Sequence, residues 1–280
     1  MHKSSKNTLI DEIRVKSRWV WEETLKIHRI AQGTRLASSL SCVEILSVLY
    51  YGGFVKNDPK DIYNENRDRF IASKAHGSVS FYPILADLGY FGADQLAKVG
   101  KNGGQLGDIP DCSIPGFETA NGSLGYGLGV GCGVSIALKK KKLDKNVFVL
   151  CGDGEMNEGS IWEAVMFAGQ NKLDNLVLVI DNNKICMLDY CRKIIDLEPF
   201  EEKFKSFGWE AVRANGHDIK NLFEQLTLLL SSDFKGPKVL IADTVKGKGV
   251  RSLESDSLCH VKALKPNLID NLLKEINENE

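Results

Sequence analysis

Two consecutive apolar stretches of the chain each end in oxygen-bearing side chains. Asp153 lies between Gly152 and Gly154 directly after the apolar residues 147–151, and Asp181-Asn182-Asn183 follows the apolar residues 176–180. A helical pattern over 160–171 separates the two stretches. If both stretches are parallel strands, their carboxyl ends meet at one edge of a sheet, where such sheets bind their ligands.

These side chains match the chemistry of a divalent metal bound together with a phosphate. A carboxylate, an amide oxygen and a nearby backbone carbonyl form a hard-oxygen set that suits Mg²⁺ or Ca²⁺. Gly152 and Gly154 permit a tight turn and let a ligand approach the backbone N–H groups closely. The sequence therefore predicts a divalent metal that holds a diphosphate at the carboxyl edge of the sheet.

Other nucleotide-binding signatures are weaker. A lone Gly-Asp-Gly is a common turn, and taken alone it would be structural. The chain has no GxxxxGK[ST] sequence, which disfavours a P-loop enzyme. The glycines of GLGVGCG, residues 127–133, lie within a helical pattern without a preceding strand, so close helix packing explains them better than dinucleotide binding.

The periodicity of the chain predicts one α/β domain over residues 1–280, with a doubly wound, mostly parallel sheet flanked by helices and helical decoration over about 1–66. Strands and helices alternate after residue 125, and the strands are apolar on both faces. Two loops are expected, at 33–41 and at 101–123. The expected strands are a segment within 67–78 and 147–151, 176–181, 209–213 and 238–242. The expected helices are 8–31, 42–51, 81–88, 125–139, 160–171, 200–207, 218–230 and 266–277.

Composition excludes several classes of protein. The 280 residues carry a formal net charge of -1, and the one basic run, residues 139–142, follows a predicted helix, so we expect no nucleic-acid partner. No apolar stretch approaches the roughly 20 residues that a membrane span needs, and we see no secretory signal. The seven cysteines are scattered without a CxxC pair, which predicts reduced thiols in a cytoplasmic protein; a Cys186/Cys191 metal or redox pair is the weaker alternative.

Motifs along almost the whole chain resemble those of the transketolase family. GDG followed after 27 residues by NN is similar to the family's thiamine diphosphate motif. The further matching segments are SLSCVEILSVLYY, RDRFIASKAHG, IPGFETANGSLGYGLGVGCG, GDGEMNEGSIWEA, NKLDNLVLVIDNNKI, ANGHDI and TVKGKGV with the following Glu254 and His260. Jointly these motifs are highly specific, and they imply the thiamine diphosphate-binding fold.

The resemblance covers only the N-terminal half of a full-length transketolase, the half that holds the cofactor's diphosphate. It therefore implies the first subunit of a split transketolase, which transfers a two-carbon ketol unit from a ketose to an aldose. A separately encoded C-terminal subunit would supply the pyrimidine-binding domain and its activating glutamate, in an α₂β₂ heterotetramer.

The resemblance also implies roles for individual residues. Asp153, Asn183 and the backbone carbonyl of Ile185 would bind Mg²⁺, or Ca²⁺ or Mn²⁺ in its place. Residues that would bind thiamine diphosphate are His76, Gly122, Ser123, Leu124, Gly154, Glu158, Asn183 and His260.

The resemblance assigns catalytic roles to His76, His260, Glu158 and Glu163. The two glutamates match the family's acidic residues that link the two active sites across the dimer. Each residue also has a structural interpretation: a turn residue for His76, a first-turn helix acid for Glu158 and a solvated helix face for Glu163. His217-Asp218 is expected to be structural or to cap a helix.

Two positions depart from the family pattern. Arg35 and Ile109 stand where transketolases carry histidines that contact the substrate. Isoleucine cannot form hydrogen bonds to a sugar hydroxyl, whereas arginine adds a permanent charge that pairs with a carboxylate or phosphate. These two substitutions predict an altered substrate site, which His260 would also contact, for a different ketose, a carboxylated sugar or a nucleotide-linked sugar.

Three other classes of function stay open on the sequence. A thiamine-dependent decarboxylase component that uses a 2-oxo acid would share GDG and NN. A non-catalytic regulatory subunit would keep the fold without needing its acidic and histidine side chains. A stand-alone Mg²⁺–phosphate enzyme would need its own base, and no credible constellation for one is present.

Overall fold

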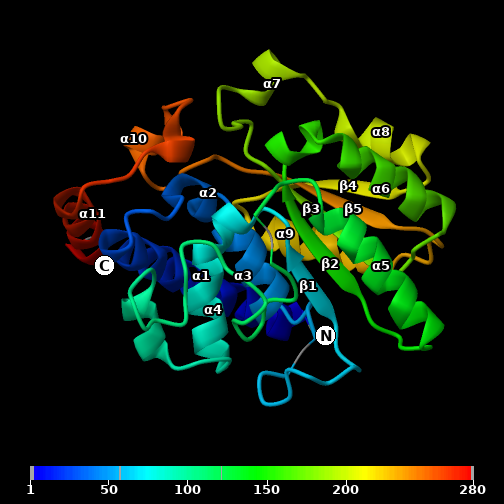
Figure 1. The fold of residues 1–280 in the computed structure, drawn as a ribbon, viewed down its shortest axis with the longest axis horizontal. Helices are drawn as coiled ribbons and strands as arrows, with labels where there is room; N and C mark the ends of the chain where they lie inside the picture. Colours follow the sequence, from blue (N-terminus) through cyan, green and yellow to red (C-terminus); the bar gives the residue numbers. More distant parts are fainter. Residues whose placement is uncertain (1–2, 57, 121, 279–280) are drawn as a thin grey trace.

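The computed structural model describes residues 3–56, 58–120 and 122–278. They form a five-stranded parallel sheet with helices around it (Figure 1). The strand order is β1-β2-β3-β5-β4, and each hydrogen-bonded pair is parallel. The strands are β1 (Arg69–Ala72), β2 (Val147–Gly152), β3 (Leu176–Asn182), β4 (Glu210–Asn215) and β5 (Lys238–Asp243).

The central strands β2 and β3 are buried along their whole length, as their unbroken apolar runs predict. In their pairing, Gly152 lies opposite Asp181, so the two strands end at the same edge of the sheet. The prediction of a doubly wound parallel sheet is confirmed. Its carboxyl edge brings together the loops that follow the strands.

One face of the sheet is covered by α5 (Gly127–Lys140), α6 (Gly159–Gln170) and α8 (Phe200–Ser206). Here α5 approaches the sheet closely because its residue 131 is glycine: a Cβ atom there would lie 2.7 Å from Val149 Cγ2. This contact supports helix packing as the reason for Gly131, whereas a Cβ atom at residue 129 or 133 would meet nothing within 4 Å.

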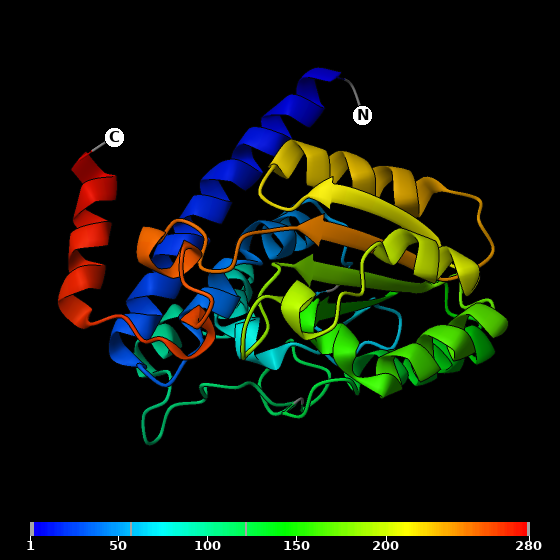
Figure 2. The same cartoon turned by 90° about the horizontal axis from the view of Figure 1, so that it is seen from above.

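The opposite face is covered by α1 (Lys3–Ile30), α3 (Val43–Tyr51), α4 (Phe81–Leu88) and α9 (Ile219–Ser231). The sheet is thus enclosed between helical layers, as Figure 2 shows from above. Alternate residues of each strand enter the two cores. Phe148 of β2 belongs to this core, whereas Val149 belongs to the core under α5 and α6.

A third hydrophobic cluster joins the start of the chain to its end. It contains Leu25 of α1, Ile185 after β3, and Cys259 near the C-terminus. It is built around α2 (Leu36–Leu40), α10 (Arg251–Glu254) and α11 (Pro266–Glu278), and Arg29 of α1 pairs with Asp270 of α11 at 2.6 Å. The remaining short elements are η1 (Ala75–Ser80), η2 (Ala93–Lys98), η3 (Gly154–Asn157), α7 (Cys191–Ile194) and η4 (Cys259–Val261).

One predicted loop was wrong in part. Residues 33–41 contain α2, a five-residue helix that is entirely buried. Its serines and lack of amphipathic repeat conceal it in the sequence, and its burial in the third cluster stabilises it instead. Within the described residues, no helix is long and apolar enough to cross a membrane.

Candidate active site

The loops that follow β1, β2, β3 and β5 surround a cavity of about 450 Å³ at the carboxyl edge of the sheet. Many of the predicted site residues line it: His76, Gly122, Leu124, Asp153, Gly154, Glu158, Asn183, Ile185 and His260. Lysines 74 and 246, Glu155 and Asn157 line the same cavity. Two cations and several oxygen donors therefore face one space.

Asp153 is the carboxylate best placed to hold a metal in this cavity. It is buried, its Oδ1 accepts a hydrogen bond from the Gly154 N–H at 2.8 Å, and its Oδ2 accepts one from the Lys184 N–H at 2.5 Å. Burial, together with the charge of Asp181, raises the pKa of Asp153 to about 6. A cation beside it would offset that cost, since an opposite charge favours the ionised form.

Asn183 and Ile185 complete a set of hard oxygen donors. Asn183 Oδ1 accepts a hydrogen bond from the Ile185 N–H at 3.2 Å, which keeps the amide oxygen close to the Ile185 backbone. The Ile185 carbonyl accepts a hydrogen bond from Lys246 Nζ at 2.7 Å. The carbonyl predicted as a metal ligand therefore already contacts a cation, and the donor set suits Mg²⁺.

Asp181 takes a different role from its neighbours. Burial alone would raise its pKa, but the Lys74 ammonium, with which it forms a fully buried ion pair, lowers the pKa below its usual range. Ser41 Oγ also donates to this carboxylate at 2.6 Å, and so does Thr244 Oγ1. Asp181 therefore supports the edge of the sheet and is not a free metal ligand.

The two predicted histidines lie together in the cavity. The rings of His76 and His260 pack edge to face with centroids 5.1 Å apart, and His260 Nδ1 lies 3.3 Å from Ser38 Oγ. Burial, reinforced by Lys74 and Lys246, lowers the pKa of both rings, to about 4 for His260. Both rings are therefore neutral at physiological pH.

A buried carboxylate fixes the loop that carries Gly122 and Leu124. Glu155 accepts hydrogen bonds from the Gly125 N–H at 2.9 Å, from the Gly152 N–H at 3.2 Å and from Ser73 Oγ. Burial raises the pKa of Glu155. One side chain thus joins the ends of β1 and β2 to the loop before α5.

The predicted glutamates are divided between cavity and surface. Glu158 lines the cavity at the N-terminus of α6, where Gly125 packs against its Cβ. Glu163 is exposed on α6 and Ser123 is exposed in its loop, and neither lines the cavity.

The two substituted positions, Arg35 and Ile109, also lie outside the cavity lining. Arg35 precedes α2, and its Nη1 lies 3.5 Å from the Gly33 carbonyl. Burial lowers the pKa of His260, and the charges of Lys246 and Arg35 lower it further. Gly33 lies against the Asp108 side chain, which places the segment before Arg35 beside the loop that carries the half-exposed Ile109.

Sequence reasoning missed the cavity's lysines and Glu155. Lys74 and Lys246 occur in quoted motifs, SKAHG and TVKGKGV, but loop lysines are normally solvated, and nothing local marks them as buried. Both lysines lie within a few residues of the end of a strand, and that position is the signal that could have identified them.

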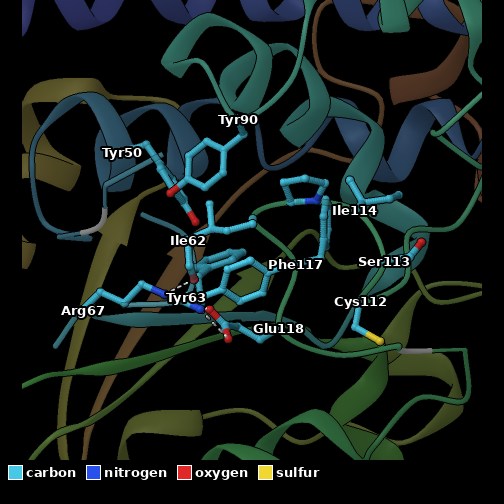
Figure 3. Close-up of a pocket in the computed structure, with 13 residues that line it drawn as sticks. Tyr50, Ile62, Tyr63, Arg67, Tyr90, Cys112, Ser113, Ile114, Phe117 and Glu118 are labelled. Carbon is cyan, nitrogen blue, oxygen red and sulfur yellow. Dashed lines mark hydrogen bonds and ion pairs between the residues drawn. The ribbon is translucent and has the colours of Figure 1, made fainter. Parts of the chain in front are cut away.

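A second cavity, of about 260 Å³, lies beside the edge strand β1 and is lined by Arg67, Phe70 and residues 112–118 (Figure 3). Arg67, which precedes β1, forms a two-point ion pair with Glu118 there. Since the charged groups are paired with each other, this cavity offers little chemistry. No group of three or more His, Cys, Asp or Glu side chains among the described residues is arranged to hold a metal, which leaves the Cys186/Cys191 metal pair without support.

Comparison with known proteins identifies the family. Residues 24–278 match the family described as "Transketolase, thiamine diphosphate binding domain". The chain is 35% identical over 274 residues to one of the subunits of the apulose-4-phosphate transketolase of Actinobacillus succinogenes, covering 97% of this chain and 98% of that one. It is 34% identical over 226 residues to the 6-deoxy-6-sulfo-D-fructose transketolase subunit SqwG of Clostridium sp., covering 80% and 82%.

The fold is that of a solved transketolase as well. The crystal structure from Campylobacter jejuni matches with a TM-score of 0.85 and 27% identity, over 97% of this chain and 42% of that one. The chain thus spans about two fifths of that transketolase but nearly the whole of the Actinobacillus succinogenes relative. These matches support the transketolase interpretation over the 2-oxo acid alternative. The chain belongs to the transketolase family, as a thiamine diphosphate-binding domain of that family.

Proposed function

We propose that this chain is the diphosphate-anchoring subunit of a two-component transketolase, which moves a two-carbon ketol unit from a ketose to an aldose. The observation that carries the proposal is the single cavity that holds Asp153, Asn183, Lys246 and both histidines in a member of this family. One domain over residues 1–280, decorated by helices over about 1–66, accounts for the site. A cytoplasmic location stays a prediction from the cysteines.

The proposed anchoring divides between oxygen donors and cations. Asp153, Asn183 and the Ile185 carbonyl would hold Mg²⁺, and the N–H groups near Gly154 together with Lys246 would hold the diphosphate. Gly122, Ser123 and Leu124 would line the rest of the cofactor. When bound, thiamine diphosphate supplies the carbanion chemistry that breaks and forms the carbon–carbon bond.

The histidines would handle protons in this arrangement. Because burial, reinforced by the charges of Lys74 and Lys246, lowers the pKa of both rings and keeps them neutral, His76 and His260 can accept a proton from a substrate hydroxyl and return it. Glu158 lies at the start of α6, and Glu163 lies on its exposed side. We assign both glutamates to the connection between the two active sites of the dimer.

A second subunit is expected to cover the cavity. Large apolar side chains on the loops around it are exposed, including Met187 at 58% and Leu188 at 70%, and Leu258 and Val261 near His260 are similarly exposed. An α₂β₂ heterotetramer would bury this rim under the partner's pyrimidine-binding domain, which would also supply the activating glutamate. A second copy of this chain would pack on the exposed face of α5 and α6.

We infer that the substrate is a sugar carrying an anionic group, as a sugar phosphate does. The relatives act, by their names, on apulose 4-phosphate and 6-deoxy-6-sulfo-D-fructose. Among the described residues, Arg35 makes no ion pair, and its charge helps, after burial and Lys246, to lower the pKa of His260. Its guanidinium is therefore available to a phosphate, sulfonate or carboxylate, with Ile109 in place of a hydroxyl-binding side chain.

Calorimetry of thiamine diphosphate with Mg²⁺ tests the cofactor site. We expect tight binding to this chain mixed with its second subunit, and weak binding to the chain alone. Asp153→Ala should lose more affinity than the roughly 10- to 100-fold that a residue outside the ligand set costs. Binding that is equally tight without the second subunit would contradict the shared site, and unchanged binding by the variant would contradict the metal assignment.

Arg35→Gln tests the substrate class. The variant should raise KM for an anionic ketose roughly 10- to 100-fold, because a hydrogen bond to a charged group contributes about 1.5–3 kcal/mol. KM for a neutral ketose should stay unchanged. Lys262→Gln removes a cation close to His260 in sequence that is paired with Asp256, and it is the matched control. Equal effects on both ketoses would refute the role of Arg35.

A further inference from the structure

The turn after β4 lies directly against the end of β5. The Gly216 N–H donates to the Asp243 carbonyl at 2.7 Å, and a side chain at residue 216 would collide with Thr244. The next residue but one, Asp218, caps α9 by accepting from the N–H groups of Lys220 and Asn221. Capping by Asp218 is thus confirmed. His217, which lies between Gly216 and Asp218, takes no part in the cap.

Both ring nitrogens of His217 have partners outside its own turn. The Val245 N–H donates to Nε2 at 2.8 Å, so Nε2 carries no proton. The proton therefore resides on Nδ1, which donates to Glu44 Oε2 of α3 at 3.1 Å. The histidine side chain is 12% exposed, and its contact with Glu44 is partly buried, whereas Val245 itself is 38% exposed.

Val245 stands between Thr244, which contacts a buried carboxylate, and Lys246, which lines the cofactor cavity. Thr244 Oγ1 donates to the buried Asp181, and Lys246 Nζ donates to the Ile185 carbonyl. Lys246 is buried and lines the cavity. The hydrogen bond from Val245 to His217 thus fixes the backbone immediately before the cavity's second ammonium.

The segment needs such a fixed point because its own sequence is permissive. Gly247 and Gly249 adopt positive φ angles of 79° and 87°, which glycine populates without strain and which allow many alternative paths in the absence of contacts. On the downstream side, the Gly247 N–H donates to the Ala37 carbonyl at 2.9 Å, and Trp21 Nε1 donates to the Lys248 carbonyl at 2.8 Å. On the upstream side, His217 holds Val245, next to Thr244, whose N–H donates to the Asn182 carbonyl at 3.2 Å.

We propose that His217 is a positioning residue that sets the affinity for thiamine diphosphate by holding segment 244–248, and with it Lys246, in the binding conformation. Its ring links α3, the turn after β4 and the loop after β5. Binding costs less when the cation is already in place. The inference rests on the proposed cofactor role of Lys246.

The test compares variants of the complete complex by calorimetry with thiamine diphosphate and Mg²⁺. His217→Ala should raise Kd about 10-fold, the loss expected for one hydrogen bond of about 1.4 kcal/mol. At saturating cofactor its kcat should stay within about twofold of the wild type, since the residue does not touch substrate. His217→Gln should recover most of the affinity, because its amide oxygen can accept from the Val245 N–H.

Asn221→Ala is the matched control for general loosening of the turn. Asn221 Oδ1 accepts from the Asn215 N–H at 2.8 Å in the same turn but does not contact Val245. This variant should lower Tm without changing Kd. Hydrogen exchange should be faster at the Val245 amide in His217→Ala and unchanged there in Asn221→Ala.

Two results would overturn the inference. The first is that His217→Ala and Asn221→Ala have the same Kd for thiamine diphosphate. The second is that the hydrogen-exchange rate of the Val245 amide is the same in His217→Ala as in the wild type. A wild-type complex that binds no thiamine diphosphate would overturn the proposed function instead, and the hydrogen-exchange result would still report on the contact between His217 and Val245.

Discussion

At the scale of single residues, the buried pair of Lys74 and Asp181 supports the site without belonging to its predicted ligand set. Their side chains are 1% and 0% exposed, and Ser41 and Thr244 satisfy further lone pairs of the carboxylate. Removing two charges from water is costly, and such a pair is stable only when its hydrogen bonds are complete. Removing one partner of the pair should therefore lower the free energy of unfolding strongly.

Lys74→Met should lower the free energy of unfolding by roughly 3–5 kcal/mol, because Asp181 would remain buried and unpaired. The double variant Lys74→Met/Asp181→Leu should recover a large part of that loss. Urea unfolding of both variants measures the difference. A single variant as stable as the wild type would mean that the carboxylate finds another partner or is solvated.

The sequence could predict only part of the site at this scale. Asp153 and Asn183 could be predicted because the ends of the apolar strands and their spacing can be read from the sequence. Both residues line the cavity. Lys74, Lys246 and Glu155 were not, because their burial depends on segments far away in the chain, such as Ser38 and Gly125. Asp181 was taken with its neighbours as part of the site, and only the structure reveals its lysine.

At the scale of elements, His28 joins the end of α1 to the C-terminal segment. The Leu264 N–H donates to His28 Nε2 at 3.3 Å, and His28 Nδ1 lies 2.7 Å from Thr34 Oγ1. Since Thr34 Oγ1 donates to the Ala31 carbonyl, His28 donates through Nδ1. A protonated ring would lose the bond from Leu264.

The free energy of unfolding should therefore decrease as the pH falls through a defined range. Burial lowers the pKa of His28 from 6.5 to about 4, so between these values the unfolded chain binds a proton that the folded chain does not. The free energy of unfolding attributable to His28 should be fully present above about pH 6.5 and should decline by roughly 3 kcal/mol as pH falls to about 4.

His28→Gln keeps polar groups at this position without a titrating ring. Urea unfolding at pH 4.5 and pH 7 should show a smaller change for the variant than for the wild type. His76 and His260 titrate in both proteins and cancel in the comparison. An identical pH dependence would contradict a neutral, buried His28.

Helices and strands were predicted correctly where the hydrophobic pattern of the sequence matches the way the element packs in the fold. The helix at 81–88 was predicted to the residue, and the strands around 147 and 176 were predicted within one residue, since their apolar runs are unbroken. The helix α2 was missed because its stability comes from burial against Leu25 and Leu253 rather than from its own sequence. Short elements such as α7 and α10 have too few residues to display a period.

At the scale of the whole molecule, the exposed apolar rim around the cavity predicts where the second subunit binds. Leu188→Glu should weaken the complex at least 10-fold, because a charge would be buried in the interface core. The fold of the chain should be unaffected, since Leu188 is 70% exposed. Analytical ultracentrifugation of the mixed subunits measures the loss.

Leu228→Glu is the control for this prediction. Leu228 is 59% exposed near the end of α9, a helix that begins at the carboxyl edge and runs back toward the opposite edge of the sheet. The variant should assemble like the wild type. If Leu228→Glu disrupts the complex and Leu188→Glu does not, the partner binds elsewhere.

The division of labour among the loops has a consequence for protein engineering. The loops that we propose as the metal anchor are joined to each other through Asp153 and the Lys184 N–H, whereas the segment before Arg35 lies against the loop of Asp108 and Ile109. Randomising positions 35 and 109 together would therefore diversify which sugars are accepted while leaving the anchoring loops untouched. A combinatorial library at these two codons could be screened for new carbon–carbon bond formation without first repairing the catalyst.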